Sequence, residues 1–246
     1  TTTMGVEAAR NALRGSSLIP SSIWFATANP AYLDKTNATA IQAALDLPQD
    51  TWAVDAGGSA RSAEAAILGA SGTAGVSMAV ISDLRTGNPT SNDESSGGDA
   101  AAALIFGDDD DAPVLAHALG RAASTGEFLD RYRLPGENSS RIWEERFGEQ
   151  AYLALAQDAI ERATKSANVG IEDVDKVIIA GMHARAVRGL SKIAGDKLVD
   201  DLTGLIGNPG AAQLPLLVAS ALDQAEPGET ILCVHLADGA YASVVR

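Results

Sequence analysis

The stretch TWAVDAGGSARSAEAAILGA, residues 51–70, joins a short apolar run to a helical pattern through a turn that contains Asp55, two glycines and Ser59. An apolar run, a glycine-containing turn and a helix in this order predict a strand-to-helix elbow, the unit from which α/β folds are built. Such elbows display nucleophiles or hold phosphates at the start of the helix. The tip of this elbow carries Ala60 and Arg61, with neither a cysteine nor a phosphate-binding lysine.

Two common elbow motifs do not fit these residues. The turn lacks the G-x-G-x-x-G spacing of a dinucleotide-binding loop. In the G-x-S-x-G pattern of hydrolases, Gly57 and Ser59 take the first two fixed positions, but Arg61 stands where the second glycine is required. A purely structural interpretation is that small residues let the helix pack closely against its neighbour, which would account for Ala63, Ala65, Ala66 and Ala70.

Strand patterns alternate with helical patterns along the whole chain. Helical patterns cover residues 4–15, 37–48, 62–74, 142–168, 184–195 and 211–225, and strand patterns cover residues 21–28, 51–56, 76–83, 99–107, 112–120, 174–182, 229–237 and 241–246. This order predicts an α/β fold with helices on both faces of its sheets. Residues 1–120 and 121–246 repeat the same succession, which predicts two similar halves that arose by duplication. The polar stretch RTGNPTSNDESSGGD, residues 85–99, predicts a long surface loop over an active site.

Composition excludes several classes of protein. The 246 residues are 46% hydrophobic and carry a formal net charge of −14, which argues against broad binding to nucleic acid or anionic membranes. Cys233 is the single cysteine and lies in an apolar run, so it predicts packing and excludes a disulfide framework. Because no apolar run approaches the roughly 20 residues that cross a bilayer, we expect a cytoplasmic protein without a membrane span. We also expect no metal in this chain.

Five motifs in order resemble the thiolase superfamily. They are VEAARNAL with SSIWFATANPAY (6–13 and 21–32), GGDAAAALIFGD (97–108), VDKVIIAGMHARAVRGL (174–190), IGNPGAAQLPLLVASAL (206–222) and PGETILCVHLADGAYASVVR (227–246). The likeness is to its initiating condensing enzymes, ketoacyl synthase III and the hydroxymethylglutaryl-CoA synthases. It implies a thiolase-like fold of two βαβ-type halves with mixed sheets covered by helices. It also implies that the family's first strand is missing here, as in a fragment or a processed product.

The resemblance assigns candidate site residues. His183 and Asn208 match the family's catalytic histidine and asparagine. The acylated cysteine of the family falls at Ala60, and the acidic residue that hydroxymethylglutaryl-CoA synthases use as acid and base falls at Ala28. Ser59, beside Ala60, is a weak replacement nucleophile because a serine needs a base within hydrogen-bond reach. In a purely structural interpretation, His183 is a histidine at a strand end whose hydrogen bonds are satisfied, and Asn208 is a turn residue.

The retained residues suggest a reaction. His183 and Asn208 could donate hydrogen bonds to a thioester carbonyl and stabilise an enolate while a carbon–carbon bond is formed or broken, or an acyl group is transferred. Arg185, Arg188 and Lys192 share one helix face, which could receive the phosphates of coenzyme A or could simply be solvated.

The resemblance also implies partners: an acyl-CoA substrate, a second copy of the chain in a homodimer, and an OB-fold and zinc-ribbon module. The sequence leaves two alternatives for its activity, because the cysteine position holds Ala60. The first is an active enzyme. The alternative is a catalytically inactive scaffold subunit that holds a thiolase or an OB-fold protein.

Overall fold

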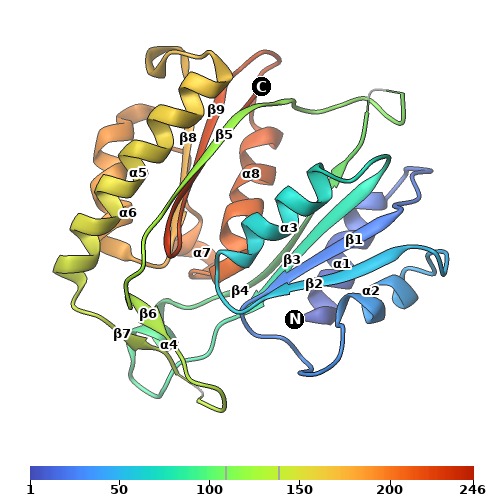
Figure 1. The fold of residues 1–246 in the computed structure, drawn as a ribbon, viewed down its shortest axis with the longest axis horizontal. Helices are drawn as coiled ribbons and strands as arrows, with labels where there is room; N and C mark the ends of the chain where they lie inside the picture. Colours follow the sequence, from blue (N-terminus) through green and yellow to red (C-terminus); the bar gives the residue numbers. More distant parts are fainter. Residues whose placement is uncertain (109, 138) are drawn as a thin grey trace. The chain divides into compact units, whose positions relative to one another are not determined.

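The computed structural model describes residues 1–108, 110–137 and 139–246, and it divides into two compact units (Figure 1). The first unit consists of Thr1–Arg85, Gly98–Leu115 and Pro209–Ala219, and the second of Thr86–Gly97, Ala116–Asn208 and Ser220–Arg246. Each unit is built around its own four-stranded sheet.

The sheet of the first unit has the order β2-β1-β3-β4. Strands β1 (Ser22–Thr27), β2 (Trp52–Gly57) and β3 (Ser77–Leu84) are parallel, and β4 (Asp99–Phe106) is antiparallel to β3. The helices α1 (Thr2–Leu13), α2 (Ala38–Ala44) and α3 (Ser62–Ser71) belong to this unit. The sheet is therefore mixed, as the resemblance to the thiolase superfamily implied.

The central strands β1 and β3 of the first sheet are buried on both faces, which explains their unbroken apolar runs. Successive side chains of a strand point to opposite faces. In β1, Ile23 and Phe25 join the cluster formed with α1 and α2, whereas Trp24 and Ala26 pack with the small residues of α3. Gly69 of α3 lies against the Trp24 ring, where an added Cβ would come within 2.5 Å of the ring, so the small residues of this helix permit a close approach.

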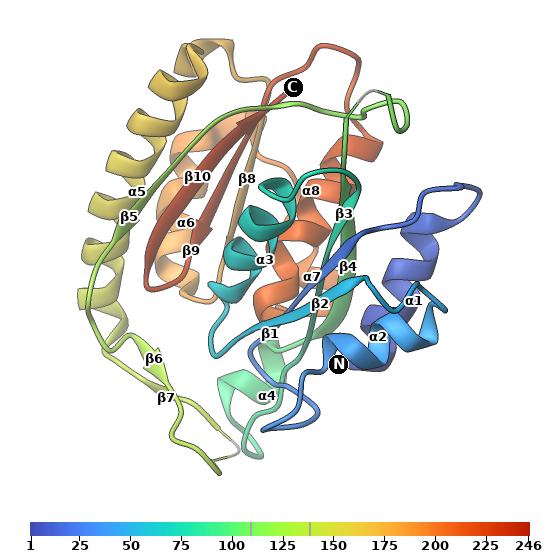
Figure 2. The same ribbon diagram turned by 45° about the vertical axis from the view of Figure 1, so that its right-hand side comes forward.

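The sheet of the second unit has the order β5-β10-β9-β8. Strand β8 (Lys176–Gly181) is parallel to β9 (Ile231–Leu236), while β10 (Gly239–Val245) is antiparallel to both β9 and β5 (Ala118–Thr125). Helix α5 (Glu145–Ala167) runs along β5 and β10, and α6 (Ala184–Ala194) packs against α5 and β8 (Figure 2).

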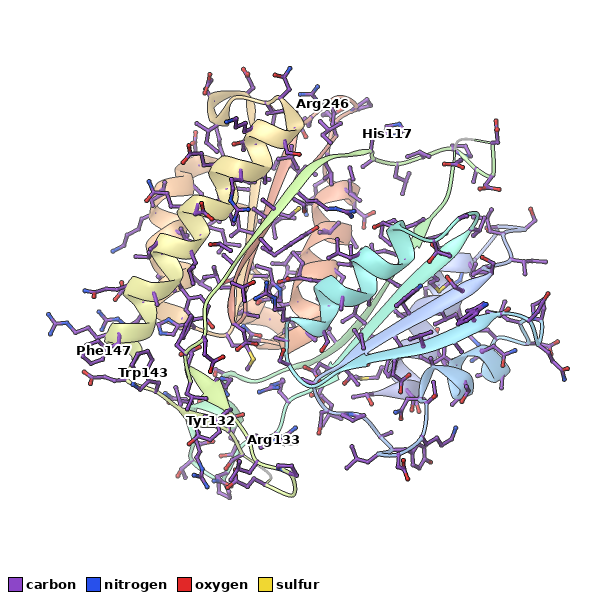
Figure 3. All side chains as sticks on the ribbon, viewed as in Figure 1. His117, Tyr132, Arg133, Trp143, Phe147 and Arg246 are labelled. Atoms are coloured by element: carbon purple, nitrogen blue, oxygen red, sulfur yellow. The ribbon has the colours of Figure 1, made fainter. Side chains whose placement is uncertain are left out.

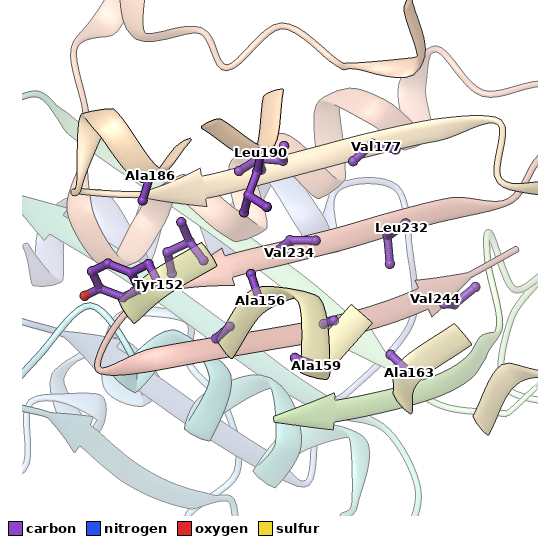
Figure 4. Close-up of a cluster of buried hydrophobic side chains, with 14 of the residues drawn as sticks. Tyr152, Ala156, Ala159, Ala163, Val177, Ala186, Leu190, Leu232, Val234 and Val244 are labelled. Atoms are coloured by element: carbon purple, nitrogen blue, oxygen red, sulfur yellow. The ribbon is translucent and has the colours of Figure 1, made fainter. Parts of the chain in front are cut away.

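The core of the second unit lies between α5 and its sheet. Tyr152, Ala156, Ala159 and Ala163 line the inner face of α5 and meet the valines and leucines of β8, β9 and β10 (Figure 4). The remaining elements are α4 (Asn92–Ser96), β6 (Arg131–Tyr132), β7 (Arg141–Ile142), α7 (Thr203–Ile206), α8 (Gln213–Asp223) and the 3₁₀ turns Ile171–Asp173, Gly195–Lys197 and Gly210–Ala212.

One predicted strand was wrong in position and in partner. Residues 112–120 were expected to complete the first half, but β5 spans Ala118–Thr125 and pairs with β10 in the second unit. Pro113 fixes its backbone φ and has no N–H for a strand ladder, and residues 112–117 lie outside the strand, although His117 exchanges two backbone hydrogen bonds with Arg246. The two units are made of interleaved segments. A duplication with its boundary at residue 120 stays a prediction.

Within the described ranges, no helix is long and apolar enough to cross a membrane.

Candidate functional site

His183 lies just beyond the carboxyl end of β8 and is the N-cap residue of α6. Its Nδ1 accepts a hydrogen bond from the backbone N–H of Ala186 at 3.1 Å. An N-cap acceptor satisfies one of the helix N–H groups that have no partner within the helix. Because Nδ1 uses its lone pair in this way, the proton of the neutral ring lies on Nε2.

The Nε2 atom of His183 faces a buried polar group. The side chain is 2% exposed, and Nε2 has no hydrogen-bond partner among the residues that the structure describes. Asp130 Oδ1 lies 3.9 Å away, beyond hydrogen-bond distance. The nearest backbone is that of Gly148 in α5, where an added Cβ would lie 2.6 Å from Nε2 and 3.2 Å from Asp130 Oδ1. Only glycine lets α5 approach the imidazole this closely.

Asp130 is held from two sides. The hydroxyl of Tyr152 donates to its Oδ2 at 3.1 Å, and the backbone N–H of Trp143 donates to its carbonyl oxygen at 2.7 Å. Burial, and after it the charge of Asp130, raises the pKa of Tyr152 well above its usual value of 10.0, so the phenol keeps its proton and remains a donor. The Tyr152 ring also lies beside His183, with 5.4 Å between ring centroids.

Sequence reasoning missed Asp130 and Tyr152. Asp130 precedes the short strand β6, and Tyr152 lies on α5, so each is distant in sequence from His183. No local spacing connects the three residues. The only signals are an acidic residue in the run FLDRY and a single tyrosine within the alanine-rich face of α5.

Asn208 is fixed at the same strand end as His183. Its Nδ2 donates to the carbonyl oxygen of Gly181 at 2.8 Å, and Gly181 is the last residue of β8. The backbone N–H of Asn208 donates to the carbonyl oxygen of Ser96 at 2.8 Å, and Gly97 forms a bridge with Asn208. The structure therefore brings His183 and Asn208 to one end of β8.

The polar loop of residues 85–99 is tied to this region. It contains α4, whose last residue, Ser96, holds the backbone of Asn208. Asp93 of α4 forms an ion pair with Arg131 at 2.7 Å, and Arg131 directly follows Asp130. The contacts of residues 86–97 with Asn208 and Arg131 fit the expectation of a loop next to a site.

The elbow that carries Ser59 and Ala60 lies in the first unit. Helix α3 begins at Ser62, so Ala60 precedes the regular helix by two residues, and not directly at its start as expected. The N–H of Ser62 donates to Ser59 and that of Ala63 to Ala60, at 3.1 and 3.2 Å, in a tight turn that leads into the helix. Helix ends often tighten in this way.

Asp55 in the elbow has a structural role. Its carboxylate accepts hydrogen bonds from the backbone N–H of Asn37 at 2.6 Å and of Ala38 at 2.7 Å. It therefore caps α2, and it fixes the loop before that helix to β2.

Ala28 and the elbow lie at the same end of two neighbouring strands. Thr27 pairs with Gly57 in the parallel register of β1 and β2, so Ala28 and Gly58 both follow the carboxyl ends of these strands. Ligands of α/β sheets bind at such ends. The region contains a buried acid, Asp83, which accepts from Thr27 Oγ1 at 3.2 Å and from the Ala211 N–H at 3.1 Å. Burial raises the pKa of Asp83 above its usual value of 3.8.

The predicted basic face lies on α6. Arg185 Nε donates to Glu149 Oε2 of α5 at 2.9 Å, so this arginine already has an ionic partner. Arg188 and Lys192 are exposed. Near the start of α5, Trp143 stacks on Phe147 with 5.6 Å between ring centroids, and both side chains are visible together there (Figure 3).

No family model matches the chain. Among curated proteins, it is 31% identical to the hydroxymethylglutaryl-CoA synthase of Pyrococcus furiosus over 251 residues, which cover 97% of this chain and 71% of that protein. The corresponding protein of Thermococcus sibiricus is 30% identical over the same shares.

Solved structures of the same superfamily cover nearly the whole chain. A variant of OleA from Xanthomonas campestris superposes with a TM-score of 0.81 at 17% identity, covering 99% of this chain and 81% of that one. The 3-oxoacyl-(acyl carrier protein) synthase III of Pseudomonas aeruginosa gives a TM-score of 0.80 at 20% identity, with shares of 99% and 82%. An HMG-CoA synthase complexed with CoA gives 0.81 at 18% identity, with shares of 99% and 68%.

Proposed function

The chain belongs to the hydroxymethylglutaryl-CoA synthase family and has the thiolase fold, and from this premise we propose that it binds an acyl-CoA and forms or breaks a carbon–carbon bond beside the thioester carbonyl. It is a condensing-enzyme homologue by sequence. The curated relatives are named synthases, and one solved neighbour contains CoA. These names support an acyl-CoA substrate for this chain.

The observation that carries the proposal is the placement of His183 and Asn208 at one end of β8. Asn208 donates a hydrogen bond to the carbonyl oxygen of Gly181, two residues before His183, at the end of the strand. Breaking or forming the bond next to a thioester leaves negative charge on the carbonyl oxygen. Fixed donors in a buried site stabilise that charge more than water does, because they need no reorganisation during the reaction.

The proposed reaction does not pass through an acyl-enzyme. Ala60 has no nucleophilic atom, and within the described part of the chain the Ser59 backbone N–H contacts Ser62 Oγ while no base is found bonded to the Ser59 hydroxyl. An enolate forms without a covalent enzyme intermediate, so the loss of the cysteine is compatible with cleavage or formation of the carbon–carbon bond. Acyl transfer to the protein would require another nucleophile.

Arg188 and Lys192 are proposed contacts for the phosphates of coenzyme A. Both are exposed on α6, the helix that His183 caps. Arg185 contributes less to phosphate binding, because Glu149 offsets its charge. Calorimetry with CoA should show weaker binding for Arg188→Glu and Lys192→Glu than for Arg185→Ala.

A homodimer through the first sheet is also proposed. Strand β2 lies at one end of the order β2-β1-β3-β4, and Trp52 on it is 74% exposed. A strand at a sheet edge offers its backbone groups to a second strand. A thiolase or OB-fold partner stays a prediction.

The direct test is turnover of a panel of acyl-CoA thioesters, including acetoacetyl-CoA with acetyl-CoA and hydroxymethylglutaryl-CoA alone, with products followed by mass spectrometry. We expect turnover by the wild type and a loss of at least about 100-fold in Asn208→Ala, the scale of losing one oxyanion donor. Asn11→Ala, at an exposed position of α1, is the matched control and should retain full activity. Failure of the wild type to bind or convert any thioester would favour the scaffold alternative, which the family relationship does not favour.

A further inference from the structure

The proposed reaction needs a base, and His183 is not arranged to be one. Its Nδ1 accepts the Ala186 N–H, so its proton lies on Nε2 and the ring acts as a hydrogen-bond donor. Cleavage of a bond between the α- and β-carbons of a thioester must also remove the proton of a β-hydroxyl group. The family's acid–base position holds Ala28, which has no titrating group.

A carboxylate faces the donor atom of His183. Asp130 Oδ1 lies 3.9 Å from Nε2, and the Asp130 side chain is 9% exposed. Its other oxygen accepts from Tyr152, which fixes the orientation of the carboxylate. The backbone of Gly148 closes one side of the pair, where an added Cβ would lie 2.6 Å from Nε2 and 3.2 Å from Oδ1. The result is one donor and one acceptor side by side, both buried.

We propose that Asp130 is the general base of this site, acting on the β-hydroxyl group of a β-hydroxyacyl thioester. The inference rests on the proposed function. The carbonyl oxygen and the β-hydroxyl of such a thioester are attached to carbons separated by a single carbon, so they lie close together on one side of the molecule. A donor and an acceptor separated by 3.9 Å match this arrangement: Nε2–H binds the carbonyl oxygen and Oδ1 accepts from the hydroxyl.

The step balances without a further reactant. Asp130 Oδ1 takes the hydroxyl proton, and the O–H electron pair becomes the second bond of a new carbonyl group. The bond between the α- and β-carbons breaks, and its electron pair passes into the thioester as an enolate, whose oxygen accepts from His183 Nε2–H. The proton on Asp130 then returns to the α-carbon. The products are a shorter acyl-CoA and a carbonyl compound, and the reverse sequence is an aldol addition.

The test compares Asp130→Asn with Asp158→Asn, an exposed aspartate on α5, using hydroxymethylglutaryl-CoA and 3-hydroxybutyryl-CoA as probes. We expect Asp130→Asn to lower kcat by about 10²- to 10⁴-fold, the usual contribution of a general base, with KM changed less than about threefold. Asp158→Asn should match the wild type. Melting curves for both variants show whether the loss is one of folding.

A second measurement needs no substitution at Asp130. The chain has three histidines, so His183→Ala identifies the His183 imidazole signals in a ¹⁵N NMR spectrum. We expect the neutral ring of the wild type to carry its proton on Nε2. A proton on Nδ1, or full turnover in Asp130→Asn, would overturn this inference and leave the proposed function standing. A wild type that converts no thioester would contradict the proposed function and this inference together.

Discussion

His183 Nδ1 accepts a hydrogen bond from the backbone N–H of Ala186 at 3.1 Å, so the histidine that matches the family's catalytic residue is also the N-cap of α6. A residue with two roles cannot be tested by alanine alone, because the alanine variant loses both the donor and the cap.

His183→Ala should therefore lose stability as well as activity. Loss of an N-cap costs about 1 kcal/mol, which lowers the Tm by roughly 2–4 °C in a protein of this size. His183→Ser keeps a capping oxygen and should retain more of that stability, yet it should be as inactive as His183→Ala. Thermal melts and thioester turnover of the two variants separate the roles. Substantial activity in His183→Ser would show that the imidazole is not a catalytic donor.

Gly148→Ala tests the close approach of α5 to the imidazole. Alanine is normally favoured over glycine within a helix by about 1 kcal/mol. Here its Cβ would lie 2.6 Å from His183 Nε2, so we expect a lower Tm and a large loss of turnover. Gly204→Ala is the matched control, because an added Cβ at Gly204 has nothing within 4 Å. If the two variants had the same Tm and the same turnover, His183 would not lie against Gly148 in solution.

Asp83 should make stability depend on pH. Burial raises the pKa of this carboxyl group above 3.8, against the opposing effects of the Ala211 N–H and Arg85. The folded chain thus holds the Asp83 proton more tightly than the unfolded chain. The stabilising contribution is complete below the ordinary pKa and is lost as pH rises through the raised pKa.

Asp83→Asn removes this titration. Between about pH 4 and pH 7, the urea midpoint of the variant should therefore fall less, or rise more, than that of the wild type. Parallel curves for the two proteins would show that Asp83 has the same proton affinity in the folded and unfolded chains.

Much of the fold could be predicted from the sequence. The strands β1, β3, β8 and β9 are buried on both faces, so each is a continuous apolar run that can be recognised without knowing its tertiary contacts. The family relationship and the mixed sheets were confirmed by the comparisons and the strand pairing. The strand at β5 was misplaced because its residues are small and half-buried, and its position depends on packing against α5. At Gly120, an added Cβ would lie 2.4 Å from the Ala167 backbone nitrogen.

The candidate site was only partly predictable. The sequence placed His183 after the strand pattern of residues 174–182, whereas the contact of Asn208 with Gly181 at the end of β8 was not predicted. The catalytic roles of both residues stay predictions. Asp130 and Tyr152 come near His183 through the tertiary packing of α5. No regular spacing between these residues in the sequence indicates that they are close. The assignments of Ala60, Ser59, Ala28 and the basic face stay predictions.

Ala60→Cys should restore the chemistry of the lost thiol if the elbow retains the family's site. A thiolate at this position attacks the acetyl-CoA carbonyl, and the CoA thiolate leaves. Intact-mass spectrometry should then show one acetyl group per chain in the variant and none in the wild type. An acetyl group on wild-type Ser59 would show that the nucleophile assignment is wrong.

Enolate formation is the central claim, and exchange of the α-protons of acetyl-CoA in deuterated water measures it most directly. Mass spectrometry of recovered acetyl-CoA should show deuterium incorporation well above the uncatalysed rate with the wild type. Asn208→Ala and His183→Ser should each reduce that incorporation by at least about 100-fold. Deuterium incorporation that is absent in the wild type, or unchanged in both variants, would contradict the assignment of these residues to thioester chemistry.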